Sequence, residues 1–346
     1  MISSTYAEKS LTDTIADTMA GRCACLFPGH TEALEGRVVP CGDDTAKVTL
    51  ASVDVPWRVP TNPNDASAAH SNITLRTWGG EKMTAAVERE STPRDAYMRI
   101  VGEVAERAGA RGGKTVISRC ITGTFAPGAR ENFTQALFGL FPGSFRFSFS
   151  HPQCGCWAGA SPELLLHLDA QTLAIDTQAL AGTRRRGTAS PWDAKNMEEH
   201  RLVVDDMLAR LGACTGVADV HAGEPYSQGY GDIEHLCTPI RGRVTDAGAF
   251  EATAMALHPT PAVGGWPRAE ALADIRRYEP HKRGFYGGTV VGPDTAYVIL
   301  RCVHYDADRW CVYVGSGITG DSRADDEWLE TEAKAEALLR LLTTRR

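Results

Sequence analysis

Two glutamates and a lysine near the C-terminal end of the sequence have a spacing that could support chemistry. Glu327, Glu330 and Lys334 fall at positions i, i+3 and i+7, which share one face of a helix. Two carboxylates beside an ammonium group are typical of a site that binds a cation together with a carboxylate. The alternative is a solvated helix face with an i, i+4 ion pair, and the helix taken alone favours this alternative.

The helix that carries these residues has a separate apolar face. Trp328, Ala335, Leu339 and Leu342 recur at helical spacing and predict the side that packs inward. Acidic residues at 325–326 suit the positive end of the helix dipole. The charged face is therefore not needed for packing.

Composition excludes several classes of protein. A chain of 346 residues with 43% hydrophobic residues can bury a large core, so we expect a globular protein. The net charge of −7 argues against nucleic-acid binding, which usually needs a basic surface. The compact basic cluster at 184–186 is either a solvated loop or a contact for an anion.

No segment of the sequence predicts export or membrane insertion. The first twenty residues lack a basic start followed by an apolar stretch, and no window approaches the roughly 18 apolar residues of a membrane helix. We therefore expect a cytoplasmic location and reduced cysteines, mostly buried singly, such as Cys120, Cys302 and Cys311. The C-x-C pairs at 23/25 and 154/156 match structural zinc sites poorly.

Helices and strands alternate without a regular βαβ order. We expect helices over 93–108, from about 191 to 211, and over 249–257, 268–277 and 325–342, with Thr92 as the cap of the first. Predicted strands cover 114–119, 145–149, 163–168, 172–175, 239–244, 289–291 and 296–304. This pattern favours a large α+β domain with mainly antiparallel sheets, in which residues 1–90 form a β-rich part and residues 91–346 the catalytic region.

Four segments, taken together and in this order, resemble one enzyme family. They are KTVISR at 114–119, GASPEL at 159–164, LHPTPAVGG at 257–265, and GSGI at 315–318 running into EWLE at 327–330. The set is similar to the chorismate-binding enzymes, and the third segment is most similar to isochorismate synthases. The likeness extends from about residue 114 to the C-terminus.

The resemblance implies a fold and a cofactor. The fold is two stacked antiparallel β-sheets flanked by helices, with the active site in the cleft between the sheets. The cofactor is Mg²⁺, with Glu199 and Glu330 as ligands and Glu327 nearby, directly or through water. Carboxylates without histidine or thiolate partners suit such a hard cation. Asn196 stands where some relatives have a second acid, which leaves the outer metal shell open.

The resemblance also implies how a chorismate substrate is held. One carboxylate would meet the metal and the backbone amides of Gly182 and of a turn at 315–317, while the other would meet Arg301 and Lys334. A structural role for the histidine at 235 remains an equal alternative. The substrate contacts carried over from the family are Gly182, Thr183, His235, Ala262, Tyr286, Arg301, Gly315, Gly317 and Lys334.

The reaction implied is addition of water at C2 of the chorismate ring with loss of the C4 hydroxyl. Lys114 matches the family's general base, which needs a pKa well below the reference of about 10.4. Glu163 matches the general acid, which must hold its proton and needs the opposite shift. Without the resemblance, the lysine would be a surface residue opening a strand and the glutamate a turn cap.

Three residue positions and one segment bear on which member of the family this chain resembles. Anthranilate-type synthases usually carry an uncharged amide in place of Lys114, so we expect water as the nucleophile and no amidotransferase subunit. Ala181 replaces the lysine that aminodeoxychorismate synthases often have. Tyr286 is common in salicylate synthases, which go on to eliminate pyruvate, whereas the segment at 257–265, which includes Ala262, favours isochorismate synthase. A non-catalytic chorismate-binding protein is the remaining alternative, and a monomer is expected.

Overall fold

Antiparallel strands form one continuous ladder in this computed structural model. It describes residues 22–26, 34–40, 47–53, 71–82, 84–141 and 143–344. The first half of the ladder contains, in pairing order, β12 (Ile233–Val244), β9 (Ala174–Arg185), β8 (Leu164–Asp169), β15 (Thr295–Val298), β14 (Thr289–Val291) and β4 (Ser71–Arg76). Two further strands, β10 (Val217–Ala222) and β11 (Tyr226–Tyr230), pair with β12. The second half contains β6 (Phe145–His151), β7 (Gly155–Ser161), β16 (Cys302–Tyr305), β17 (Arg309–Ile318), β5 (Lys114–Thr124) and β13 (Gly265–Trp266).

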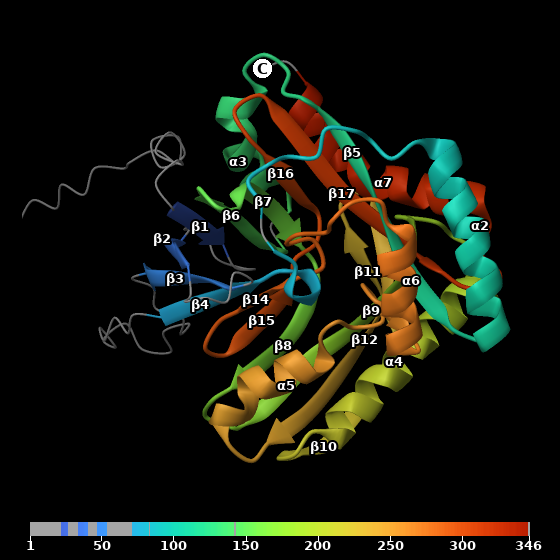
Figure 1. The fold of residues 1–346 in the computed structure, drawn as a ribbon. Coiled ribbons are helices and arrows are strands. Elements are labelled where there is room, and N and C mark those ends of the chain that lie inside the picture. Colours follow the sequence, from blue (N-terminus) through green and yellow to red (C-terminus); the bar gives the residue numbers. More distant parts are fainter. Residues whose placement is uncertain are drawn as a thin grey trace, which may run out of the picture.

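The N-terminal strands join the two halves. β4 pairs with β3 (Lys47–Val53), β3 with β2 (Leu34–Pro40), β2 with β1 (Arg22–Leu26), and β1 with β6. The predicted arrangement of two antiparallel sheets with flanking helices is confirmed (Figure 1), and the two sheets are hydrogen-bonded to each other through these strands. Within the predicted 1–90 segment, residues 1–21, 27–33, 41–46, 54–70 and 83 lie outside the described residues. The division at residue 90 stays a prediction.

Helices cover the outside of the strands (Figure 1). They are α2 (Arg94–Arg111), α3 (Ala129–Leu140), α4 (Ala194–Ala213), α5 (Phe250–Leu257), α6 (Arg268–Tyr278) and α7 (Ala324–Thr343). α4 packs against β9, α6 against β5, and α7 against β17. Apolar side chains such as Leu165, Val203 and Leu257 form a core cluster beneath α2, α4, α5 and α6, whereas α3 and the end of α7 pack on a second cluster that includes Phe133 and Leu338. Burial of this apolar surface is the main force that holds helices and strands together.

Three predicted details are wrong. Thr92 does not cap α2: the helix begins after Pro93, and the Thr92 hydroxyl accepts the backbone N–H of Cys120 instead. The predicted strand at 296–304 is split into β15 and β16. Residues 315–317 lie within β17, a strand the sequence pattern missed, and not in a turn.

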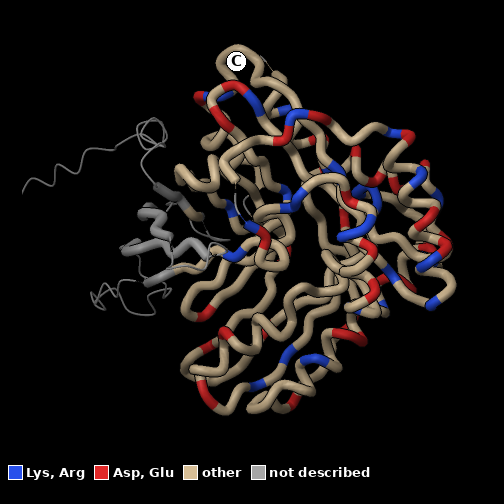
Figure 2. The backbone as a smooth tube through the Cα atoms, in the orientation of Figure 1, with Lys and Arg blue, Asp and Glu red and all other residues tan. Residues whose placement is uncertain are grey.

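Charges on the described residues are mixed in sign. Figure 2 shows basic and acidic residues interspersed along the chain, and Arg184 of the basic cluster pairs with Glu234 and lies over the ring of Trp192. Because Glu234 already pairs with its guanidinium, Arg184 is not free to bind an anion. Cys120, Cys302 and Cys311 are buried free thiols. Among the helices described, none combines the length and the apolar character needed to cross a membrane.

Candidate active site

A small pocket lies between the two halves of the ladder. It is lined by β5 and β17 on one side and by the ends of β9 and β12 on the other. The predicted residues that line it are Lys114, Glu163, Gly182, Thr183, Glu199, His235, Ala262, Tyr286, Arg301, Gly315, Gly317 and Lys334. The fold therefore brings together side chains more than 200 residues apart in the sequence.

Glu163 is a buried carboxyl group at the junction of β7 and β8. Its Oε1 lies 2.9 Å from the hydroxyl of Thr260, which comes from the loop after α5. Burial raises the pKa of Glu163 to about 7, although Thr260 and Lys114 act in the opposite direction. A carboxyl group that still carries its proton near neutral pH has the property a general acid needs. The carboxyl group is buried in the cavity and accepts from Thr260, whereas the sequence alone also allowed a turn cap.

Lys114 opens β5 and points into the cavity. Its side chain is only 1% exposed, and its Nζ lies 2.9 Å from Oε1 of Glu199. The surface location considered from sequence is therefore wrong. Glu199 comes from the second turn of α4. Burial alone would raise the pKa of Glu199, but Lys114 and Lys195 lower it to about 2, so this carboxylate stays charged.

The start of α4 anchors the loop beside the cavity. The carboxylate of Asp193 caps the helix by accepting the backbone N–H of Asn196 at 2.7 Å. The side-chain oxygen of Asn196 in turn accepts the backbone N–H of Thr183 at 3.2 Å. Asn196 therefore holds the end of β9 against the start of α4.

Two glycines in the cavity wall are required by geometry. Gly182 has φ of 76° and sits at a bulge, where the pairing of β9 with β12 shifts between His235 and Leu236. A side chain at Gly317 would overlap the carboxylate of Glu199 and the side chain of Lys114. Glycine thus lets the backbone of β17 come close to the ion pair.

The three carboxylates predicted to bind a metal all lie beside lysines. Glu327 is buried, and its Oε1 lies 2.7 Å from Nζ of Lys195. That same Nζ is 3.9 Å from Glu199, while Glu330 pairs with Lys334 at 2.6 Å. Burial and the neighbouring charge of Glu330 raise the pKa of Glu327. Lys195 bridges two of the three carboxylates.

The residue types fit a divalent cation. Oε2 of Glu327 is buried without a hydrogen-bond partner, and an unpaired buried carboxylate oxygen is costly unless a cation meets it. Within the described ranges, no three acidic, histidine or cysteine side chains form a ready-made metal cluster. Glu327 and Glu330 line a second cavity that adjoins the first at Thr183, whereas Glu199 lines the first.

Lys195 and Thr260 contact the candidate carboxylates, and sequence reasoning missed both. Lys195 precedes Glu199 by one helical turn, and this i, i+4 spacing was the available signal. Thr260 lies inside the family-like segment 257–265, in which only Ala262 was predicted to contact the substrate. Its contact with Glu163 spans 97 residues, so no local pattern reports it.

Known proteins resemble this chain over much of its length. A family model described as "Chorismate binding enzyme" matches residues 65–343. The salicylate biosynthesis isochorismate synthase of Pseudomonas aeruginosa is 36% identical over 203 residues, which cover 54% of this chain and 42% of that protein. Isochorismate synthase EntC of Escherichia coli K12 is 27% identical over 81% of this chain and 76% of its own length.

Solved structures share the fold. The menaquinone-specific isochorismate synthase MenF of Escherichia coli superposes with a TM-score of 0.71 at 20% identity, over 97% of this chain and 92% of that one. The chain spans about half the length of the first curated relatives it matches, at 42% and 53%. Since the family match covers most of the sequence and the fold is shared, this chain belongs to the chorismate-binding enzyme family.

Proposed function

We propose that this protein is an isochorismate synthase, which converts chorismate to isochorismate. The observation that carries the proposal is the pair Lys114 and Glu163, a buried amine and a carboxyl group with its pKa near 7 in one cavity. Relatives named isochorismate synthases support the same activity. The anthranilate-type alternative, which uses ammonia, is disfavoured by the lysine at position 114.

The residues divide the reaction between them. Lys114, once deprotonated, takes a proton from water as the water oxygen bonds to C2 of the ring. The ring double bonds shift, the C4–O bond breaks, and Glu163 gives its proton to the departing hydroxyl, which leaves as water. One water enters and one leaves, and proton exchange with solvent resets both side chains.

The substrate's two carboxylates need cationic and N–H partners. Arg301 and Lys334 supply positive charge on one side of the cavity, and Lys334 is held by Gly315 O at 2.9 Å and by Glu330. The backbone near Gly182 and Thr183 faces the cavity from the other side. Arginine suits this task because its guanidinium can donate two parallel hydrogen bonds to one carboxylate.

Mg²⁺ is the cofactor we propose, held by Glu199, Glu327 and Glu330. When bound, it supplies a positive charge that a substrate carboxylate can meet. Excess chelator is therefore expected to lower activity at least about 100-fold, and added Mg²⁺ to restore it, because the charge holding the substrate would be lost and regained. Steady-state rates with chelator and with chelator plus excess Mg²⁺ test this. Full activity in chelator would remove the metal from the proposal.

The products decide between two activities. Tyr286, buried against Gly315 with its hydroxyl toward β17, is the residue that favours salicylate formation by loss of pyruvate. Incubation with chorismate and Mg²⁺, followed by separation of isochorismate, salicylate and pyruvate, is expected to give isochorismate without pyruvate. Equal amounts of salicylate and pyruvate would instead assign a salicylate synthase. Unchanged chorismate would indicate a binding protein. We propose that the enzyme acts as a monomer without an amidotransferase subunit.

Thr260 provides a test of the acid through pH. A protonated Glu163 is required, so kcat is expected to fall as pH rises through about 7. The Thr260 hydrogen bond lowers the pKa of Glu163, so Thr260→Val should move this fall to higher pH by a fraction of a unit to about one unit. Thr260→Ser keeps the hydroxyl and is the matched control. The same pH profile in the valine variant and in the unmodified enzyme would contradict the role of this contact.

A further inference from the structure

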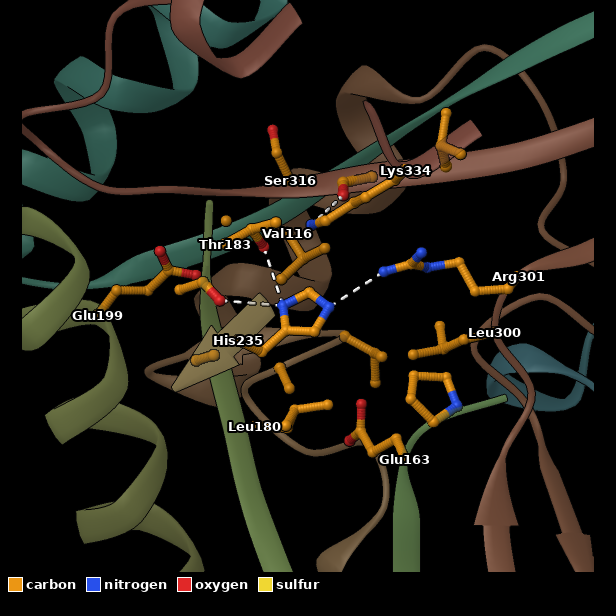
Figure 3. Close-up of a pocket in the computed structure, with 18 of the residues that line it drawn as sticks. Val116, Glu163, Leu180, Thr183, Glu199, His235, Leu300, Arg301, Ser316 and Lys334 are labelled. Carbon is orange, nitrogen blue, oxygen red and sulfur yellow. Dashed lines mark hydrogen bonds between the residues drawn. The ribbon is translucent and has the colours of Figure 1, made fainter. Parts of the chain in front are cut away.

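The ring of His235 touches both carboxylate-binding sides of the cavity. Its Nδ1 lies 3.0 Å from the carbonyl oxygen of Gly182 and 3.1 Å from the hydroxyl of Thr183. Its Nε2 lies 3.1 Å from Nη2 of Arg301. Figure 3 shows His235 between Thr183 and Arg301, with the Arg301 side chain extending toward the ring. One imidazole therefore links the β9 bulge to the arginine.

These partners allow only one form of the ring. A carbonyl oxygen can only accept, so Nδ1 must carry the hydrogen that bonds Gly182. A guanidinium can only donate, so Nε2 must present its lone pair to Arg301. Burial and the charge of Arg301 lower the pKa of His235 to about 3, which agrees with a neutral ring. His235 is thus uncharged, with a fixed tautomer.

Arg301 is held in an unusual conformation. Its φ is 47°, a left-handed value that residues other than glycine rarely adopt. The residue lies at the break between β15 and β16, so this backbone turns the side chain into the cavity. In the described part of the chain, no carboxylate lies within ion-pair distance of its guanidinium. An arginine held in this conformation and left without an acidic partner is suited to receive an anion.

We propose that His235 is a positioning residue: as a neutral hydrogen-bond acceptor, it aims Arg301 at a carboxylate of the substrate and fixes its distance from the Gly182 bulge. This inference rests on the proposed function for the identity of that substrate. His235 itself then neither donates nor takes a proton during turnover.

Two substitutions of His235 test the roles of Nδ1 and Nε2 separately. His235→Gln places its side-chain oxygen near the position of Nε2 and can still accept from Arg301. His235→Asn ends near the position of Nδ1 and keeps only the Gly182 side. The asparagine variant is expected to raise KM and the calorimetric Kd for chorismate about 10–100-fold, because a hydrogen bond to a charged group is lost. The glutamine variant should stay within about 5-fold, and the shape of the pH profile should not change in either.

A second measurement does not depend on turnover. In protein with ¹⁵N-labelled histidine, the His235 signals should show a protonated Nδ1 and an unprotonated Nε2, with no titration between about pH 5 and pH 9. Equal losses in the two variants, or a ring that titrates in this range, would overturn the positioning role. If no isochorismate forms but the NMR signature is found, the proposed function fails while the placement of Arg301 by His235 stands.

Discussion

Replacing Lys114 is expected to lower kcat by about 10²–10⁴-fold, the range typical of a general base. Lys114→Ala removes the amine altogether. Lys114→Gln is the sharper variant, because its amide N–H can still reach Glu199 but cannot take a proton from water. Steady-state kinetics with chorismate give kcat, and calorimetry gives the affinity, which should change much less than kcat.

The control for this variant is a lysine outside the cavity. Lys282 is exposed, and Lys282→Gln makes the same chemical change without touching Glu199. It should leave kcat and the unfolding temperature unchanged. Undiminished turnover in Lys114→Gln would remove the proposed base, whatever the affinity for chorismate.

Replacing Glu163 is expected to have an effect of similar size. Glu163→Gln has nearly the same shape and keeps an oxygen that can accept from Thr260, but it has no acidic proton for the departing hydroxyl. We expect kcat to fall about 10²–10⁴-fold and the fall in rate near pH 7 to disappear from the remaining activity. Rates measured across pH in both proteins test both statements. An unchanged fall near pH 7 in the variant would assign that titration to another group.

Stability distinguishes lost chemistry from a lost fold. The folded-state pKa of Glu163 is raised from 4.5 to about 7, so the folded protein binds the proton more tightly than the unfolded chain. This favourable contribution is present below the unfolded pKa and is lost as pH rises to about 7, with an upper limit of roughly 3 kcal/mol. At a pH above 7, Glu163→Gln should therefore unfold at the same or a higher temperature than the unmodified protein. A clearly lower unfolding temperature would mean that packing had been damaged.

Local sequence patterns predicted five of the six described α-helices and missed α3. α4 and α6 begin and end within about three residues of their predicted positions, because capping residues and apolar spacing act over a few residues. β17 was missed because its apolar run ends in two glycines, which resemble a turn. The break between β15 and β16 was missed because Arg301 adopts a positive φ there. An arginine in a sequence does not predict a positive φ, as a glycine would.

The candidate site was predictable mainly through family motifs. Spacing alone placed Glu327, Glu330 and Lys334 on one helix face but left a solvated face as the better interpretation. The choice between a binding site and a solvated face depends on contacts between residues far apart in the sequence, such as Lys195 and Glu327, which are separated by 132 residues. Ion pairs of this kind depend on how sheets and helices pack, so they become visible only in three dimensions.

The backbone bonds through β1–β4 also limit how the protein can move. These strands tie the Gly182 side of the cavity to the Lys114 side along one edge, so the two walls cannot swing apart there like a clamshell without breaking several hydrogen bonds. Substrate must then enter and leave by rearrangement of side chains or of the opposite edge. A substitution that disrupts the β1–β6 pairing is expected to weaken substrate binding without changing any residue that contacts the substrate.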